Sequence, residues 1–315
     1  MKISIIGVGA IGGYIAANLL KCQQYKVQLL VKPSSALLTS THLSVAGLTE
    51  LTTPTDEIIT DINQMNGDVI FITTKSTSND TLFASLRHLK NKIFIILQNG
   101  IGVEDLLAQH VDDSNTIIGA ISNIKLTKGE AIGQVILHSD FCNIVYATSH
   151  NPAPKNPSQQ KRLLSLPALF HTTFRDVHCL KNIYQVRFPK LMINIACNAA
   201  SIIDNQTLYG LSQSQTSRQM IHLLSEEVRQ VSQYYNVEIK ANMMTDIVNS
   251  FNATQYKNVY FSMKQDFDLG LPLEMKNVFY HFIELATQAN IPTPTTNSAL
   301  FKINTLLNHR ENAKK

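Results

Sequence analysis

The chain has 315 residues, of which 44% are hydrophobic and 16% are charged, with a formal net charge of +4 at pH 7. This length allows two domains, and the mild charge comes without the clustered basic and aromatic residues that nucleic-acid binding requires. The four cysteines (Cys22, Cys142, Cys179, Cys197) are scattered without a C-x-x-C pair, so we expect reduced thiols in a cytoplasmic protein and no metal site.

The first segment is apolar enough to be mistaken for a signal peptide or a membrane span. No charged residue occurs from position 3 to position 20, but four glycines interrupt this stretch. A spanning helix gains little from such a cluster, and the apolar run changes to a helical pattern within the segment. We therefore expect a strand at 2–6 and a helix from 10 to about 21, and no membrane segment.

Between this strand and helix lies the motif G-x-G-x-x-G, formed by Gly7, Val8, Gly9, Ala10, Ile11 and Gly12. In dinucleotide-binding folds the first glycine allows a tight turn and the second lets the backbone approach a pyrophosphate. The third lets the helix pack against the strand, and the helix N-terminus faces the phosphates. The motif alone is weak evidence, but its place between a strand and a helix predicts dinucleotide binding rather than a merely structural turn.

The end of the second strand, at 27–31, indicates which dinucleotide is bound. NAD-binding folds usually carry an acid there to hold the ribose 2′-hydroxyl, whereas this chain has no acidic residue before Glu50. Instead Lys32 is followed by Pro33, Ser34 and Ser35. A cation with neighbouring hydroxyls suits a 2′-phosphate. Although most such lysines are solvated surface residues, the missing acid favours NADPH as the cofactor.

Two further buried strands, at 68–74 and 93–97, end in Lys75 and in the turn Gln98-Asn99-Gly100. Helical patterns at 78–89 and 103–109 alternate with them, which predicts a parallel sheet covered by helices. Ligands bind at the carboxyl ends of such strands, where Gly7, Lys32, Lys75 and Asn99 would meet. More strands are expected at 116–122, 134–138 and 174–177, and a Pro-rich loop of no defined function at 151–158.

Beyond position 179 the pattern changes to long helices, at 189–203, 212–235, 240–249, 274–289 and 296–307. We therefore expect an α/β fold class: an N-terminal Rossmann-type dinucleotide-binding domain over 1–179 and an all-α C-terminal domain over 180–315.

One of these helices carries a polar row on an apolar background. Pro189 suits a first helical turn, and Lys190, Asn194 and Asn198 then recur every four residues, so they stack on one face over roughly 12 Å. A lysine and two amides are costly to bury without partners. The row therefore predicts a polar ligand.

Taken with two later residues, this row makes the chain resemble the ketopantoate reductase family (2-dehydropantoate 2-reductases) nearly end to end. From local sequence, Ser262 indicates only a helix cap and Glu274 an acid at a helix start. The row K-x-x-x-N-x-x-x-N, the motif Ser262-Met263 with Asp266, and an acid twelve residues after the serine all have counterparts in the family, as do the G-x-G-x-x-G motif, Lys75 and the Gln98-Asn99-Gly100 turn.

The resemblance implies a site in the cleft between a Rossmann domain and a helical domain, and NADPH-dependent reduction of 2-dehydropantoate to pantoate in pantothenate and coenzyme A biosynthesis. Lys190 would be the general acid that protonates the carbonyl oxygen, and Glu274 would bind the substrate hydroxyl. Asn194, Asn198 and Ser262 would hold the substrate, while Asn99 and Lys75 would lie between the nicotinamide ribose and the substrate. A cationic donor suits the negative charge that hydride addition builds on oxygen.

Two departures from the family pattern leave the exact keto acid open: Lys32 replaces a more usual arginine, and Phe261 precedes Ser262 where some relatives have a second serine. One alternative is a reductase of the same fold for another 2-oxo or 3-hydroxy acid. Another is a regulatory protein that binds NADP(H) without turnover. The expected partner is a small keto acid, with no nucleic acid and no membrane. A homodimer is one candidate state of association.

Overall fold

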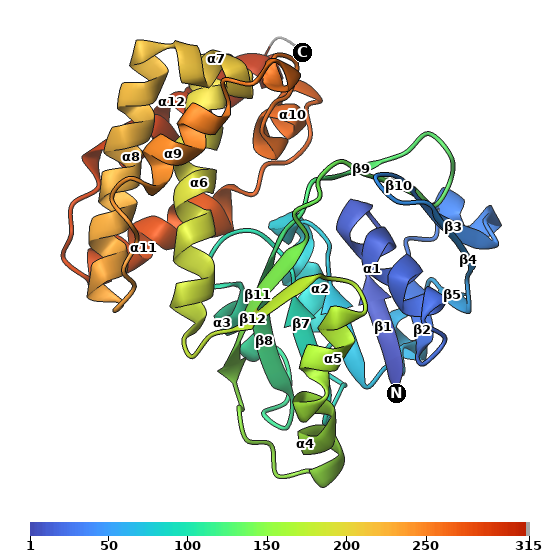
Figure 1. Ribbon diagram of the computed structural model, residues 1–315. Coiled ribbons are helices and arrows are strands. Elements are labelled where there is room, and N and C mark those ends of the chain that lie inside the picture. Colours follow the sequence, from blue (N-terminus) through green and yellow to red (C-terminus); the bar gives the residue numbers. More distant parts are fainter. Residues whose placement is uncertain (313–315) are drawn as a thin grey trace. The chain divides into compact units, whose positions relative to one another are not determined.

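The computed structural model describes residues 1–312, and its first half is built on an eight-stranded sheet (Figure 1). The strand order is β12-β11-β8-β7-β6-β1-β2-β5. Neighbouring strands are parallel except β8 and β11. The strands are β1 (Lys2–Ile6), β2 (Lys26–Leu30), β5 (Glu57–Ile59), β6 (Val69–Ile72), β7 (Ile93–Ile96), β8 (Thr116–Asn123), β11 (Asn143–His150) and β12 (Asp176–Cys179).

Helices cover both faces of this sheet because its central strands are apolar throughout. Every residue of β6 and β7 is buried. One core contains Phe71 with residues of α1 (Ala10–Lys21) and α5 (Leu166–His171). The other contains Ile70 with residues of α2 (Asn79–Ser85) and α3 (Val103–Ala108). The predicted parallel sheet covered by helices is thus confirmed. The sequence pattern did not predict strand β11 or helix α5.

A second, four-stranded sheet packs on α1. Its order is β4 (Leu51–Pro54), β3 (His42–Gly47), β10 (Gln134–Leu137) and β9 (Leu126–Lys128). The strand expected at 134–138 therefore exists as β10 but belongs to this small sheet. Its parallel partner β3 lies about ninety residues earlier in the chain, so local sequence carries no signal for the pairing.

The expected Pro-rich loop at 151–158 is shorter than predicted. Pro157 opens α4 (Pro157–Leu164), and the side chain of Asn156 caps that helix by accepting from the backbone N–H of Ser158 at 3.0 Å and of Gln159 at 3.3 Å. Asparagine before a first-turn proline is a good helix start, and the loop interpretation missed it.

The second half of the described chain is helical, as expected. Its elements are α6 (Ile183–Ile203), α7 (Leu208–Gln213), α8 (Gln215–Tyr234), α9 (Met243–Ser250), α10 (Ser262–Asp268), the π-helix η5 (Lys276–Tyr280), α11 (His281–Gln288) and α12 (Pro294–Asn312). Short 3₁₀ helices complete the described chain: η1 (Ala36–Thr39), η2 (Ile62–Gln64), η3 (Ser76–Ser78) and η4 (Thr254–Tyr256).

Helix α6 begins earlier than predicted. Pro189 lies inside the helix and not in its first turn, which starts at Ile183. The backbone N–H of Tyr184 donates to the Asn182 side chain at 2.8 Å, so Asn182 acts as the cap that the sequence interpretation overlooked. Because proline has no N–H, the carbonyl of Gln185 has no helical donor at position 189.

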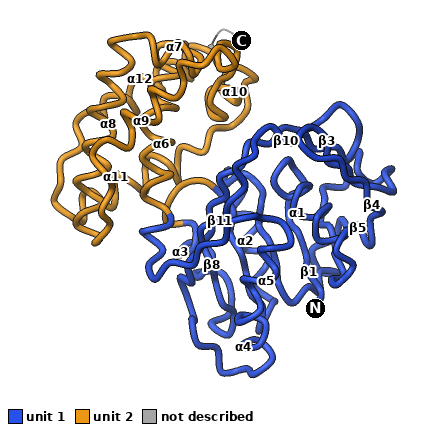
Figure 2. Tube along the Cα trace, in the orientation of Figure 1, with its two compact units in different colours: residues 1–98, 103–186 blue, residues 99–102, 187–315 orange. Residues whose placement is uncertain are grey.

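The chain divides into two compact units, shown in Figure 2. One contains residues 1–98 and 103–186, and the other contains 99–102 together with the chain from 187 onward. The division falls inside α6, after Val186, whereas we expected a break after Cys179. Residues 99–102, which follow β7 directly, count with the helical unit. No helix among residues 1–312 is long and apolar enough to cross a membrane.

Candidate active site

The glycine-rich turn after β1 is held by two threonines that follow β6. Gly7 has φ +91°, and a Cβ there would stand 2.6 Å from Cγ2 of Thr74. The hydroxyl of Thr73 donates to the Gly7 carbonyl at 2.6 Å and to the Ile6 carbonyl at 3.0 Å. A Cβ at Gly12 would overlap the Gly7 carbonyl oxygen. The first and third glycines of the motif are therefore required by packing, as their expected roles demand.

Gly9 is different, because space lies beside it. It is the N-cap of α1 and provides no side-chain hydrogen bond to the helix, whose first turn contains no acidic residue. A Cβ on Gly9 would meet only Cε of Lys128, at 3.9 Å. An uncapped helix start with open space over a glycine suits the close approach of a pyrophosphate. These residues, with Val8, Ala10 and Ile11 between the glycines, thus fit a dinucleotide.

The predicted lysines both lie in exposed turns at the carboxyl ends of strands. Lys32 follows β2, and its carbonyl accepts from the Ser35 N–H at 2.9 Å. The Ser35 hydroxyl caps the 3₁₀ helix at 36–39 by accepting from Leu37 at 3.3 Å. Lys75 follows β6 and precedes the 3₁₀ helix at 76–78. The sequence therefore placed both lysines at the predicted sheet edge.

Sequence reasoning missed a buried amide pair beside this turn. Asn79 and Gln98 donate to each other's side-chain oxygens at 2.9 and 2.8 Å, and Gln98 also donates to the Thr74 hydroxyl at 3.0 Å. Both amides are almost fully buried. Since Thr74 lies against Gly7, the pair fixes the wall of the glycine-rich turn. Gln98 belongs to a turn that the sequence singled out, but the i, i+19 pairing has no local signal.

On α6, Lys190 and Asn194 lie one turn apart. Lys190 is partly exposed, burial of its ammonium group lowers its pKa, and no ion pair is recorded for it within residues 1–312. Asn194 is 7% exposed. Its Nδ2 is buried and has no hydrogen-bond partner among the described residues. An unpaired buried amide donor costs about 1–3 kcal/mol, which a ligand acceptor would recover.

Asn198, the third member of the row, already has protein partners. Its Nδ2 donates to the Asn194 carbonyl at 2.9 Å, and its Oδ1 accepts from the Met263 N–H at 3.2 Å. It therefore fastens the start of α10 to α6. Ser262 is the exposed first residue of α10, and Phe261 rather than Ser262 takes the N-cap position. The structure thus places Ser262 next to the α6 row.

Asn99 and Glu274 come together within the helical unit. Nδ2 of Asn99 donates to Oε2 of Glu274 at 3.4 Å, across 175 residues of sequence. The Ile101 N–H donates to the Asn277 carbonyl at 2.9 Å. Gly100, at φ +94°, lies so close that a Cβ would stand 2.5 Å from the same carbonyl oxygen. Residues 99–102 are therefore packed tightly against the segment that carries Glu274.

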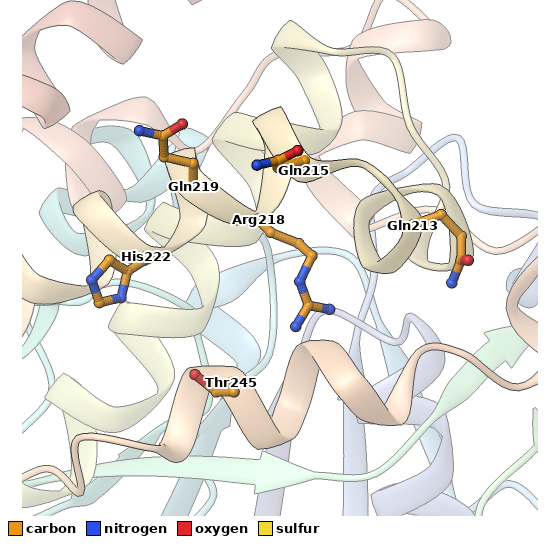
Figure 3. Close-up of a pocket in the computed structure, with 6 residues that line it drawn as sticks. All are labelled: Gln213, Gln215, Arg218, Gln219, His222 and Thr245. Carbon is orange, nitrogen blue, oxygen red and sulfur yellow. The ribbon is translucent and has the colours of Figure 1, made fainter.

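An open depression of about 580 Å³ lies on the helical unit. Figure 3 shows the residues that line it, with Arg218 extending between the helices. It is lined by Gln213, Gln215, Arg218, Gln219, His222 and Thr245, none of which was predicted as a site residue. Arg218 is held by the Ser212 carbonyl at 3.2 Å and by Oδ1 of Asn249 at 2.8 Å. Within residues 1–312 no group of three or more His, Cys, Asp or Glu side chains could hold a metal.

Models of protein families match both halves of the chain. The family described as "Ketopantoate reductase PanE/ApbA" matches residues 3–145, and "Ketopantoate reductase PanE/ApbA C terminal" matches residues 182–306. Among curated proteins, a 2-dehydropantoate 2-reductase of Nostoc sp. (strain PCC 7120 / SAG 25.82 / UTEX 2576) is 26% identical over 303 residues, which are 94% of this chain and 92% of the relative.

Solved structures share the fold. A PanE/ApbA family ketopantoate reductase from Ralstonia eutropha JMP134 has a TM-score of 0.82 at 19% identity, covering 99% of this chain and 100% of that one. D-mandelate dehydrogenase with NADH and anilino(oxo)acetate has a TM-score of 0.81 at 19% identity, covering 98% and 99%. These likenesses confirm the predicted fold class. Because the two family models together match residues 3–145 and 182–306, well over half of the chain, the chain belongs to the ketopantoate reductase family, whose members are dinucleotide-dependent oxidoreductases.

Proposed function

We propose that this chain reduces 2-dehydropantoate to pantoate with NADPH, a step towards pantothenate and coenzyme A. The observation that carries the proposal is the polar face of α6, where Lys190 lies one turn from an Asn194 amide donor that has no partner among the described residues. This combination suits a ligand with an oxyanion or carbonyl oxygen, since both groups donate hydrogen bonds.

Lys190 acts as the general acid in this proposal. NADPH, when bound, supplies the hydride. The Lys190 ammonium donates a proton to the substrate's carbonyl oxygen as negative charge develops there. Burial lowers the pKa of Lys190, which makes it a better proton donor at neutral pH than an ordinary lysine. Asn194 donates to a substrate oxygen, and Ser262, exposed at the start of α10, supplies a further hydroxyl.

Asn198 contributes to substrate binding by its position in the same row, and it also holds α10 in place through Met263. Glu274 accepts a hydrogen bond from the substrate hydroxyl, and the Asn99 amide at 3.4 Å restrains that carboxylate. A hydrogen bond from the substrate hydroxyl to this carboxylate would favour keto acids that carry such a hydroxyl over those that lack it.

NADPH is the proposed cofactor because of the residues around the glycine-rich turn. Gly7, Gly9 and Gly12 shape a pyrophosphate site, and the lysine at the end of β2, Lys32, takes the 2′-phosphate where an acid would repel it. No acidic residue precedes Glu50. Lys75 and Asn99 bind the nicotinamide half in this proposal.

A second candidate is NADH-dependent reduction of a different 2-keto acid. The shared fold with a D-mandelate dehydrogenase that binds NADH favours it, and Phe261 makes the approach to Ser262 more apolar than a serine would. Phe261 packs edge-on against Phe251, with ring centroids 5.8 Å apart. A regulatory protein that binds NADP(H) without turnover is the third candidate, but it gives no reason for Lys190.

The decisive experiment follows the loss of NADPH absorbance by purified protein with 2-dehydropantoate. Parallel reactions use NADH, a panel of 2-keto acids with and without a hydroxyl group, and the Lys190→Ala variant. Turnover of 2-dehydropantoate with NADPH that the variant lacks supports the proposal. Reduction of an aryl keto acid in its place supports the second candidate. Cofactor binding without turnover on the whole panel supports the regulatory candidate.

A further inference from the structure

Lys128, at the end of β9, points toward the start of α1. It stands directly opposite Val135 in the antiparallel pair of β9 and β10, and opposite residues of such a pair lie on the same face. That face packs against α1, because Val135 Cγ2 lies 3.0 Å from where a Cβ on Gly13 would stand. Figure 1 shows β9 and β10 beside α1. The direction of Lys128 therefore follows from sheet register.

The end of this side chain lies over the glycine-rich turn. Apart from Gly9 and its two chain neighbours, Cε of Lys128 is the only atom of residues 1–312 within 4 Å of a Cβ built on Gly9, and Gly9 is the N-cap at which α1 begins. In the described part of the chain, the end of the Lys128 side chain is thus the nearest group from a distant segment to the space that the second glycine of the motif leaves open.

This placement sets a basic side chain beside a helix start that has no acid to balance it. A helix N-terminus carries about half a positive charge, and the first turn of α1 contains no acid. No ion pair of Lys128 is recorded within residues 1–312, and the side chain is exposed. A lysine whose Cε lies beside the start of α1, over the proposed dinucleotide-binding turn, is placed where its ammonium group can reach an anion bound there.

We infer that Lys128 would bind the pyrophosphate of the dinucleotide, together with the helix N–H groups of the glycine-rich turn. This inference rests on the proposed cofactor site and adds a ligand contributed by the small sheet. The sequence motif does not include it, since Lys128 lies 119 positions after Gly9. In this proposal Lys32 binds the 2′-phosphate, which only NADPH has, and Lys128 binds the pyrophosphate that NADPH and NADH share.

The test measures dissociation constants of NADPH and NADH from their fluorescence, without keto acid, for the wild type and for Lys128→Ala. The matched control is Lys21→Ala, which removes an exposed lysine from the other end of α1. We expect Lys128→Ala to weaken both dinucleotides by a similar factor of roughly three to ten, and to reduce the dependence of binding on salt. Lys32→Ala should weaken the binding of NADPH alone, and Lys21→Ala should leave the binding of both dinucleotides unchanged.

Competition experiments separate the two phosphates. ADP has the pyrophosphate and no 2′-phosphate, whereas adenosine 2′-monophosphate has the 2′-phosphate and no pyrophosphate. Lys128→Ala should weaken competition by ADP and leave that by adenosine 2′-monophosphate unchanged. Unchanged binding of both dinucleotides, or loss for NADPH alone, overturns the inference while the proposed function stands. A wild type that binds neither dinucleotide overturns both. Thermal unfolding of each variant confirms that the folded state is retained.

Discussion

The backbone N–H of Ile101 donates to the carbonyl of Asn277 at 2.9 Å, inside the π-helix η5. A π turn disturbs the regular helical ladder and often marks a functional position, so a carbonyl there can take a partner from outside its helix. Asn277 is 1% exposed, and its side-chain amide lies 3.5 Å from the Ile101 carbonyl. Asn277 therefore holds residues 99–102 through both the N–H and the carbonyl of Ile101, and the Asn99 side chain is directed at Glu274.

Replacing Gly100 by alanine should break this arrangement. The new Cβ would stand 2.5 Å from the Asn277 carbonyl oxygen, at a φ of +94° that disfavours side chains. We expect a loss of unfolding free energy of about 2 kcal/mol or more, measured by denaturant unfolding. Gly270→Ala is the control, because Gly270 also has a positive φ, of +71°, and follows the end of α10. Equal losses in the two variants would show that backbone strain alone matters.

Asn194 and Asn198 should separate binding from stability. Asn194→Ala removes a buried donor that has no partner within the described chain, so we expect unchanged or slightly higher stability and a KM for the keto acid raised by about tenfold. Asn198→Ala leaves the Met263 N–H without its acceptor and should cost about 1–3 kcal/mol of stability. Steady-state kinetics and thermal unfolding of both variants check this. A stability loss for Asn194→Ala that matches the Asn198→Ala loss would contradict the assignment.

The pH dependence of reduction should report the ammonium of Lys190. The protonated form is the donor, so kcat/KM is high below the pKa of Lys190 and falls as pH rises through it. Since burial lowers that pKa, the fall begins at a lower pH than an ordinary lysine would give. Lys190→Arg should remove this alkaline limb together with most of the rate, because arginine stays protonated. An unchanged alkaline limb in a still active Lys190→Arg enzyme would assign it to another group.

Two adjacent glutamates on α8 should differ greatly in their contribution to stability. Glu227 is 7% exposed and accepts from the N–H groups of Thr295 and Thr296 at 2.6 and 2.9 Å, and from the Thr296 hydroxyl at 2.7 Å, at the start of α12. Glu227→Ala should cost about 2–4 kcal/mol. Glu226 pairs with Arg229 near the surface at 2.6 Å, so Glu226→Ala should cost less than about 1 kcal/mol. Urea unfolding compares them, and similar costs would show that the buried cap contributes little.

Much of the fold could be predicted from the sequence where the signal is local. The glycine-rich turn, the strand-end lysines and the row on α6 depend on spacings of a few residues, and helix and strand periods are read from the same range. The small sheet could not be predicted, because β3 and β10 come from distant segments. The pairing of Asn79 with Gln98 and the contact of Asn277 with Ile101 were likewise hidden, since tertiary packing selects them.

The α6 row shows the limit most clearly. Its period predicted that Lys190, Asn194 and Asn198 share a face, and the hydrogen bond from Asn198 to the Asn194 carbonyl agrees with that. Period says nothing about which amide already has partners. The structure shows that the Asn198 side chain accepts from the Met263 N–H, whereas Nδ2 of Asn194 has no hydrogen-bond partner among the described residues.

The four residues 99–102 have a consequence for engineering this enzyme family. These residues count with the helical unit. A gene divided at the unit boundary in α6 would therefore leave residues 99–102 with the nucleotide-binding half. A chimera that takes its helical half from one relative and its nucleotide-binding half from another would place a foreign turn against η5. Such exchanges should succeed only when residues 99–102 are exchanged together with the helical unit. The segment that must be exchanged is therefore discontinuous in the gene.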